Sequence, residues 1–443
     1  MLHIAQKHLL RAATIGLSGL GALGFTPLAA HAVEIQRVVS PQGIEAWLVE
    51  DHTVPIIAVN FSFKGGAAQD PDGKEGVTRL LASTLDEGAG DLSSEDYQAR
   101  LEDLAVSVSF DTGKDYFYGT MRTLAPTRDE AFDLLKLAIN EPRFDTVAVD
   151  RMKTQLAVGI RRQDRDPSSI ASRNLLKAML GDHPYTHPTN GTEESLGALT
   201  SKDLADQKDR IMSRDTLKIS VVGAIDAETL GPLLDKAFAN LPETGDLKPI
   251  ADIKPLAGQK VTASLDVPQA NLLFGLPGLT RDDPDYQAAF VMNHILGGGS
   301  FTSWLYEEVR EKRGLTYSTG TSLSPYDAGG LMLGSAATRA DRADETLAVI
   351  LEQFERMATD GPSQSELDSA KRFLIGSYPL RFDASGKIAR QLIALQNAEL
   401  GIDYFDRRNA EIEAVTLEDV KRVAKRLIAG KVPSVSIVGP SEG

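Results

Sequence analysis

The sequence predicts an α+β fold made of two duplicated halves, and the first observation behind this prediction is an internal repeat. Thr200 begins a helical pattern that leads into an apolar strand and ends at Gly223, and Thr416 begins a second such pattern that ends at Gly439. In both copies the glycine lies 23 positions after the threonine, and the offset between the copies is 216 residues. Each threonine is a residue type that caps helices, with acids in the following turn. The equal spacing favours duplication over chance similarity.

The order of elements within the halves is the second observation. Strand patterns over 43–63 precede a helix in the first half, and strand patterns over 261–276 precede a helix over 286–296 in the second. Neither half alternates strand and helix as a doubly wound sheet would, so we predict α+β halves. Segment 241–259 is rich in proline, glycine and charge, which indicates a linker. The predicted domains are therefore 33–240 and 260–443.

The first 32 residues are typical of a secretory signal peptide. Lys7 and Arg11 give a basic start, an apolar run extends to Leu28, and a small-x-small cleavage site ends at Ala32. Glycines and Pro27 interrupt the apolar run, which makes a permanent membrane anchor the weaker alternative. We therefore expect cleavage after Ala32 and a periplasmic location, with secretion from the cell as the alternative.

Charge and cysteine content exclude several classes of partner and site. The formal net charge is −15, and removal of the signal peptide would lower it to −17, because that segment holds two cations and no acids. So acidic a surface repels nucleic-acid phosphates and anionic lipids, and we expect neither as a partner. The chain has no cysteine, which excludes disulfides, a thiol nucleophile and a thiolate metal site.

Residues 76–90, GVTRLLASTLDEGAG, predict a helix that begins at Gly76 and ends at Gly88 and Gly90. Helical spacing places five residues on one buried face: Val77, Leu80, Leu81, Thr84 and Leu85. A second stripe holds no evident catalyst or metal ligand, and its members are Arg79, Ala82, Ser83 and Asp86.

The histidines give no clear site. His183 and His187 have i, i+4 spacing, but Pro184 and Pro188 follow them and disfavour a helix that carries both. A loop that packs its imidazoles is the favoured interpretation, and a metal site is the alternative. The glycine run at 297–299 follows a helix instead of joining a strand to a helix, which excludes a dinucleotide-binding fingerprint.

Segment 294–320, HILGGGSFTSWLYEEVREKRGLTYSTG, differs in character from the rest of the chain. Gly297, Gly298 and Gly299 leave backbone N–H groups open and permit close approach of another chain. Ser300 or Thr302 is expected to cap the helix that follows.

An arginine and a tyrosine in the same segment form the strongest candidate site. Arg310 lies in the last turn of the expected helix, and Tyr317 follows a break at Gly314, on an expected strand. Such a pair can stabilise a substrate carbonyl that becomes negatively charged during hydrolysis. A helix-end arginine that binds carbonyls, with a tyrosine that only packs, is the alternative, and the residues alone favour neither.

The run LYEEVREKRGLTYS resembles the Arg…Tyr signature of the pitrilysin/insulinase-like zinc peptidases, especially the short bacterial branch that is similar to mitochondrial processing peptidase. The resemblance covers the whole mature chain and includes SFKGGAAQDPDGKEGVTRLL and GDHPYTHPTNGTEESL. It implies two α/β-roll halves, each a mixed, mainly antiparallel sheet covered by helices. Trp304 stands where relatives commonly have arginine, which leaves open an effect on substrate choice or on a dimer contact.

Members of the family hold zinc with an inverted His-x-x-Glu-His motif on the first helix and a glutamate on a later helix. Alignment at Gly76 places Arg79 and Ser83 at the histidines and Ala82 at the catalytic base, and the third ligand falls near Gly159. None of these four residues suits the zinc mechanism. The resemblance therefore implies a member with a degenerate zinc site and no cofactor in this chain.

The resemblance also implies a division of roles, because some members work as pairs of unlike chains. We interpret this chain as the zinc-lacking subunit of a heterodimeric periplasmic metallopeptidase, inactive alone, with a homologous zinc-bearing subunit and a peptide as its partners. Arg310 and Tyr317 would stabilise the oxyanion at the partner's zinc, and the loop 297–299 would contact peptide backbone. The alternative is a non-catalytic peptide-binding or scaffold protein of the same fold.

Overall fold

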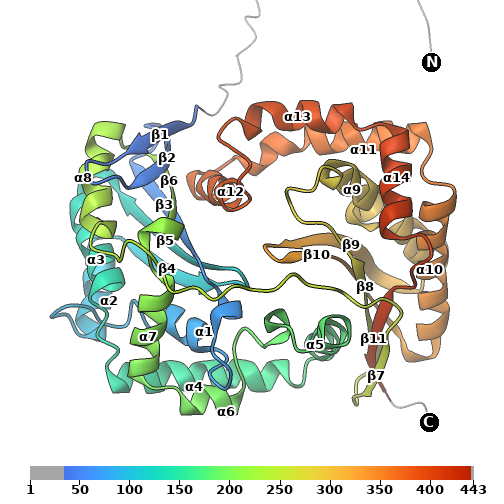
Figure 1. Ribbon diagram of the computed structural model, residues 1–443, viewed down its shortest axis with the longest axis horizontal. Helices are drawn as coiled ribbons and strands as arrows, with labels where there is room; N and C mark the ends of the chain where they lie inside the picture. The colour runs from blue at the N-terminus through green and yellow to red at the C-terminus, as the bar shows by residue number, and fades with distance from the viewer. Residues whose placement is uncertain (1–33, 441–443) are drawn as a thin grey trace, which may run out of the picture. The chain divides into compact units, whose positions relative to one another are not determined.

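The computed structural model describes residues 34–440 and contains two mixed β-sheets, one in each half of the chain (Figure 1). The first sheet has the order β1-β2-β6-β3-β5-β4, with strands β1 (Gln36–Val39), β2 (Glu45–Glu50), β3 (Ile56–Lys64), β4 (Ser107–Thr112), β5 (Tyr116–Leu124) and β6 (Lys218–Gly223). The second has the order β7-β11-β8-β10-β9, with strands β7 (Lys260–Ser264), β8 (Gln269–Pro277), β9 (Thr316–Tyr326), β10 (Gly329–Arg339) and β11 (Ser434–Gly439).

The two sheets share one topology. The order β2-β6-β3-β5-β4 in the first sheet corresponds strand by strand to β7-β11-β8-β10-β9 in the second. Each set of five strands contains one parallel pair, β2 with β6 in the first sheet and β7 with β11 in the second. In both sheets this pair consists of the strands that come first and last in the sequence. The other pairs are antiparallel. The predicted fold class, two similar halves with mixed, mainly antiparallel sheets, is confirmed.

Helices surround both sheets. The first half contains α1 (Val77–Ala82), α2 (Ser94–Asp103), α3 (Arg128–Asn140), α4 (Thr146–Gln163), α5 (Pro167–Leu180), α6 (Glu193–Ala198), α7 (Ser201–Ile211) and α8 (Ala227–Phe238). The second half contains α9 (Tyr286–Asn293), α10 (Ala343–Thr359), α11 (Gln364–Gly376), α12 (Ser385–Asn397), α13 (Tyr404–Ala414) and α14 (Leu417–Leu427). Among residues 34–440, no helix combines the length and apolar composition needed to cross a membrane.

The repeated helix–strand unit has the predicted caps in both copies. Thr200 caps α7 with a capping box in which its N–H donates to Asp203 Oδ2 at 2.8 Å, and Thr416 caps α14 in the same way with Asp419 at 2.9 Å. These boxes satisfy N–H groups that the first helical turn leaves unpaired. The strands that follow, predicted over 217–222 and 433–438, are β6 and β11, and each begins one residue later than predicted.

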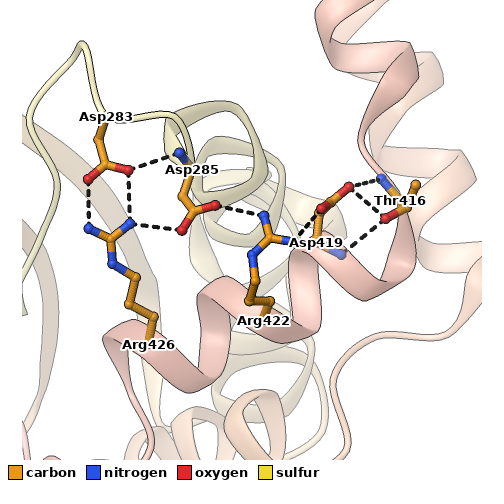
Figure 2. A network of polar contacts seen from close by, with 6 residues as sticks. All are labelled: Asp283, Asp285, Thr416, Asp419, Arg422 and Arg426. Atoms are coloured by element: carbon orange, nitrogen blue, oxygen red, sulfur yellow. Dashed lines mark hydrogen bonds and ion pairs between the residues drawn. The ribbon is translucent and has the colours of Figure 1, made fainter.

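An ion-pair network joins α14 to the segment before α9 (Figure 2). Arg426 donates to both oxygens of Asp283, at 2.9 and 2.7 Å, and to Asp285 at 2.8 Å. Arg422 bridges Asp285 and Asp419 at 2.7 and 2.5 Å. The arginines hold the pKa values of Asp283 and Asp285 below their usual range, and hydrogen bonds from Thr416, followed by that from Arg422, do so for Asp419. The cap of α14 is thereby tied to the start of α9.

One helix of each half packs against the sheet of the other half. α5 of the first half packs against β8 and β11, and α12 of the second half packs against β3 and β6 (Figure 1). Ser220 on β6 donates to the carbonyl of Ala389 at 2.8 Å, and Gln396 donates to the carbonyl of Ile219 at 3.0 Å. The two helices are therefore exchanged between the halves.

The predicted linker 241–259 contains no helix or strand, as expected. It is nevertheless held in place, because Gln69 and Lys248 exchange two hydrogen bonds of 2.8 and 2.9 Å. The N–H of Leu256 donates to the carbonyl of Met179 at 2.8 Å, and that of Ile253 donates to Ala328 at 2.8 Å. The predicted signal peptide, 1–32, lies outside the described residues.

Candidate functional site

The helix α1 begins at a position that requires glycine. Gly76, its N-cap, has φ +90°, and a Cβ there would lie 2.7 Å from the carbonyl oxygen of Asn190. The carboxylate of Asp70 accepts hydrogen bonds from the N–H groups of Gly76 at 2.7 Å and Thr78 at 3.2 Å. Burial raises the pKa of Asp70 to about 6, although these hydrogen bonds oppose the rise. An upstream acid, and not the cap residue, thus satisfies the first turn.

The predicted extent of this helix, to Gly88, was wrong. α1 ends at Ala82, and turns follow. The hydroxyls of Ser83 and Thr84 donate back to the carbonyls of Arg79 at 3.0 Å and Leu80 at 2.9 Å, and such bonds compete with continuation of the helix. The predicted buried face is confirmed, since all five of its residues are buried: Val77, Leu80, Leu81, Thr84 and Leu85.

The side chains at the three α1 positions of the zinc motif do not fit a zinc ion. Arg79 forms an ion pair with Asp111 on β4 and donates to the carbonyl of Thr112 at 3.2 Å. It therefore places a permanent cation where a metal ligand would stand. Ala82 is a buried methyl group, and the hydroxyl of Ser83 is bonded to its own helix. These residues supply no set of electron-pair donors for zinc.

The fourth position, Gly159, lies on α4, which packs against α1. It is exposed, and a Cβ built there would meet nothing within 4 Å. A side chain would have room at this point, but the chain places none there. Among residues 34–440, no group of three or more His, Asp or Glu residues is arranged to hold a metal ion.

The ring of His183 joins its loop to the linker. Its Nδ1 accepts from the N–H of Tyr185 at 3.2 Å, and its Nε2 lies 2.7 Å from the carbonyl oxygen of Ala251. These two partners assign the proton to Nε2, because Nδ1 acts as an acceptor. The contacts agree with the favoured interpretation, a loop that packs its imidazole.

Arg310 lies in a π-helical segment, η7 (Tyr306–Glu311). Its guanidinium is 4.7 Å from the centroid of the Tyr306 ring and donates to the hydroxyl of that tyrosine. The nearest carboxylate, Glu311, is 3.9 Å away, and the side chain is 35% exposed. An aromatic ring thus positions the cation, and its charge is only weakly paired.

Tyr317 is the second residue of β9, as predicted, and its side chain is 83% exposed. Within residues 34–440 its hydroxyl has no hydrogen-bond partner. A turn at Gly314, with φ +60°, returns the chain so that η7 packs against β9. The structure therefore brings Arg310 and Tyr317 onto adjacent elements, and no hydrogen bond joins the two side chains in this part of the protein.

Aromatic side chains around this pair were missed by sequence reasoning. Phe301 is 74% exposed and packs edge-on against Tyr306, with ring centroids 5.0 Å apart. Phe373 is also exposed and stacks on His294 at 5.1 Å. The available signal was Phe301 itself, a bulky apolar residue directly after a glycine run in a polar stretch.

The three glycines are explained by close packing inside the second half. A Cβ at Gly297 would lie 2.5 Å from Thr321 Oγ1, and one at Gly298 would lie 2.5 Å from Asn293 Nδ2. A Cβ at Gly299 would lie 2.7 Å from the carbonyl oxygen of His294. The glycines thus let the π-helical segment η5 (His294–Gly298) pack on β9. A contact with peptide backbone stays a prediction.

The predicted caps of the next helix, Ser300 and Thr302, were wrong. Both lie in a 3₁₀ turn, η6 (Ser300–Thr302), and Thr302 donates to the carbonyl of Gly299 at 3.0 Å. Ser303 accepts instead, from the N–H of Tyr306 at 3.4 Å. The extra turn moves the start of the helix beyond both predicted residues.

The role of Trp304 is structural. Its side chain is 3% exposed, its Nε1 donates to Glu366 at 2.6 Å, and the guanidinium of Arg356 lies 3.8 Å from a ring centroid. These contacts anchor the segment before η7 to α10 and α11. A side chain this buried does not touch substrate or a partner directly.

Two family models match adjacent parts of the chain. The model for insulinase (peptidase family M16) matches residues 46–193, and the model for the peptidase M16 inactive domain matches residues 198–374. A non-peptidase homolog, YmxG, of Helicobacter pylori is 28% identical over 334 residues, which are 75% of this chain and 77% of the relative. An uncharacterized zinc protease, YmxG, of Bacillus subtilis is 25% identical over 413 residues, or 92% and 98% of the two chains.

Solved structures show the same architecture. A peptidase M16 inactive domain from Pseudomonas fluorescens aligns with a TM-score of 0.87 at 28% identity, over 93% of this chain and 98% of that one. A protease from Helicobacter pylori aligns with a TM-score of 0.83 at 17% identity, over 92% and 100% of the chains, and this match bears on the fold alone.

Proposed function

This chain belongs to peptidase family M16 as an inactive member, and from that premise we propose that it is the zinc-lacking subunit of a heterodimeric periplasmic metallopeptidase. The observation that carries the proposal is the contrast between the two halves. The zinc positions are filled by an ion pair, a methyl group and a self-bonded hydroxyl. Tyr317 has an exposed hydroxyl. Arg310 is held by Tyr306, and its charge is only weakly paired, with Glu311 at 3.9 Å.

In this proposal a homologous partner supplies zinc chemistry, and this chain supplies hydrogen-bond donors. The phenolic O–H of Tyr317 and the guanidinium of Arg310 donate to the substrate carbonyl as it gains negative charge. A donor of this kind contributes about 3 kcal/mol to stabilisation of the transition state in comparable sites. The ring of Tyr306 holds Arg310 in place, which reduces the entropy lost when substrate arrives.

Peptide substrate has two strand edges available. β4 and β9 are the edge strands of their sheets on the side away from β1 and β7, and an extended peptide can bind by adding a strand to such an edge. Tyr317 stands at the start of β9, and the glycine loop 297–299 packs beside it. The loop would therefore meet peptide backbone close to the donor pair.

Replacement of one hydroxyl tests the catalytic role. Tyr317→Phe removes only an exposed oxygen, so we expect unchanged assembly with the zinc-bearing partner and a peptide-cleavage rate lowered more than tenfold. The rate constant for cleavage by the purified pair is the measurement. Ser318→Ala, which removes an exposed hydroxyl from the next residue of the strand, is the matched control and should cleave like the unaltered pair. Unchanged cleavage by Tyr317→Phe would remove the proposed role.

A non-catalytic peptide-binding or scaffold protein is the second candidate, and the similarity of this chain to the non-peptidase homolog of Helicobacter pylori favours it. Purification of the tagged chain from the periplasm of its source organism, followed by mass spectrometry, distinguishes the two candidate functions. A near-stoichiometric chain with His-x-x-Glu-His, and peptidase activity only in the mixture, supports the split enzyme. Recovery without such a relative supports the scaffold.

A further inference from the structure

A cleft of about 1030 Å³ lies between the first sheet and the helices of the second half. We call it the arginine cleft, because four arginines line it: Arg281, Arg381, Arg390 and Arg408. Four tyrosines of the second half line it as well, and three of them, Tyr286, Tyr378 and Tyr404, pack against Arg281 or Arg408. The cleft is separate from Arg310 and Tyr317, which do not line it.

Arg408 on α13 is a buried cation without a counter-ion. It is 5% exposed, and its guanidinium lies 3.7 Å from the centroid of the Tyr378 ring. Within residues 34–440 only its Nη1 has hydrogen-bond partners, the carbonyl of Leu374 at 3.3 Å and Asn409 Oδ1 at 3.0 Å. Among residues 34–440 no carboxylate lies within 4.0 Å. A buried charge without an opposite charge is unfavourable, unless a ligand supplies that charge.

The other three arginines are unpaired as well. Arg281 donates to the hydroxyl of Tyr404 at 2.6 Å and lies 4.2 Å from the Tyr286 centroid. In the described part of the chain, neither it nor the exposed Arg381 and Arg390 has a carboxylate within 4.0 Å. Burial, and to a lesser extent the positive charges of Arg381 and Arg281, lowers the pKa of Arg408.

Acids on the opposite wall do not neutralise the arginines. Asp111 is paired with Arg79, and Asp115 accepts from the hydroxyl of Tyr185. Asp327 is paired with Lys64 at 2.8 Å. In a chain with a net charge of −15, a cleft that gathers four unpaired cations is a local reversal of sign. Such a surface attracts anions.

We propose that the arginine cleft binds an acidic segment of a peptide, with its carboxylates on the arginines and its backbone or apolar groups against the tyrosine rings. The volume exceeds what a single small anion fills. The arginines are spread over the loop before α9, the segment after α11, and helices α12 and α13, which suits several carboxylates along a chain. The inference relies on the proposed function only for the choice of a peptide. The site lies within one chain and needs no partner.

Calorimetry with the full mature chain tests this proposal. The probe is an octapeptide with four glutamates, and the matched peptide carries glutamines at those positions. We expect the glutamate peptide to bind at least about tenfold more tightly at low ionic strength, and added salt to reduce the difference. Equal binding of the two peptides would overturn the proposal.

Variants locate the binding to the cleft. Arg381→Gln combined with Arg390→Gln changes only exposed side chains and should weaken the glutamate peptide about tenfold. Arg100→Gln, an exposed arginine on α2, is the matched control and should bind as the unaltered chain does. An equal loss in the control, or displacement of the peptide by inorganic phosphate at equal concentration, would refute an acidic-peptide site.

The outcome is distinguishable from that of the proposed function. Tyr317→Phe should bind the glutamate peptide normally, since Tyr317 does not line the cleft. Loss of cleavage in Tyr317→Phe with no selective binding of the glutamate peptide would support the catalytic pair and reject the arginine cleft. Selective binding with unchanged cleavage would do the reverse.

Discussion

At the scale of single residues, the degenerate zinc site is an arrangement that the protein has repacked. The placement of Arg79, Ala82 and Ser83 at the motif positions follows from the family resemblance and stays a prediction. The sequence could not predict that Asp111 pairs with Arg79, because Asp111 belongs to β4, 32 residues further on, and reaches α1 only through the pairing of β4 with β5. Local patterns carry no information about such contacts. Ser83, by contrast, bonds to its own helix, which is a local preference.

The carboxyl of Asp86, in the turns that follow α1, makes the stability depend on pH. Burial, and to a lesser extent the charge of Glu87, raises the pKa of Asp86 from 3.8 to about 6. A raised pKa means that its stabilising contribution is complete below about pH 4 and is lost as the pH rises through 6. At pH 7 the ionised carboxylate of Asp86 is largely buried, which destabilises the folded protein. Asp86→Asn should therefore increase the free energy of unfolding at pH 7 by roughly 2 kcal/mol.

Denaturant unfolding of both proteins between pH 4 and pH 8 checks this prediction. The difference between Asp86→Asn and the unaltered chain should be small at the acid end and should grow through pH 6. Asp91→Asn, five residues further on and exposed, is the control and should show no such growth. A difference that stays constant with pH would mean that Asp86 does not titrate in this range.

At the scale of elements, signals that lie within one turn were predictive and signals that depend on packing were not. The capping boxes of α7 and α14 are local, and both were found from the sequence. The π-helical turns η5 and η7 were not found, because a π-turn has no residue pattern of its own. In η5, Gly297 packs against Thr321 of β9, which is a contact distant in the sequence. The position of Arg310 therefore depends on a geometry that the sequence does not encode locally.

The cap of α14 gives the clearest test at this scale. Thr416→Ala removes the hydroxyl that accepts from the N–H of Asp419 at 3.1 Å, and we expect a loss of about 1 kcal/mol in the free energy of unfolding. Thr416→Ser keeps the acceptor and should lose little. Thermal and denaturant unfolding of the three proteins at pH 7 give the comparison.

The same cap carries an acid dependence with the opposite sign to that of Asp86. Hydrogen bonds from Thr416 and Arg422 lower the pKa of Asp419 to about 2. Its contribution is therefore present above about pH 4 and is lost as the pH falls through 2. The loss caused by Thr416→Ala should shrink in acid as the carboxyl is protonated in both proteins. An effect of equal size at low pH would exclude the Asp419 contacts as its source.

At the scale of the whole molecule, the two halves depend on each other through the exchanged helices. Duplication and the linker could be predicted from repeated spacing and composition. The exchange could not, because an apolar face on α12 is satisfied equally well by either sheet. Ala389 and Leu392 on α12 are fully buried, and Met179 on α5 packs with Leu331 of β10. Each sheet would lose part of its cover if the other half were absent.

We therefore expect a divided chain to fold only as a pair. Fragments 33–250 and 251–443 separate the halves inside the linker, where no helix or strand is cut. Each fragment alone should unfold without a sharp transition, because an uncovered sheet face exposes apolar surface to water. The mixture should recover one cooperative transition and elute as a 1:1 complex in size-exclusion chromatography.

Calorimetry of each fragment alone and of the mixture decides the matter. A fragment that unfolds as sharply alone as in the mixture would show that α5 and α12 are accessories to independent domains. The expected result would mean that the surfaces on the two sides of the arginine cleft cannot form separately, since Tyr116 on β5 and Arg390 on α12 both line it. Motion of one half relative to the other would then require α5 and α12 to separate from the sheets on which they pack. Any opening of the cleft would therefore involve partial unfolding.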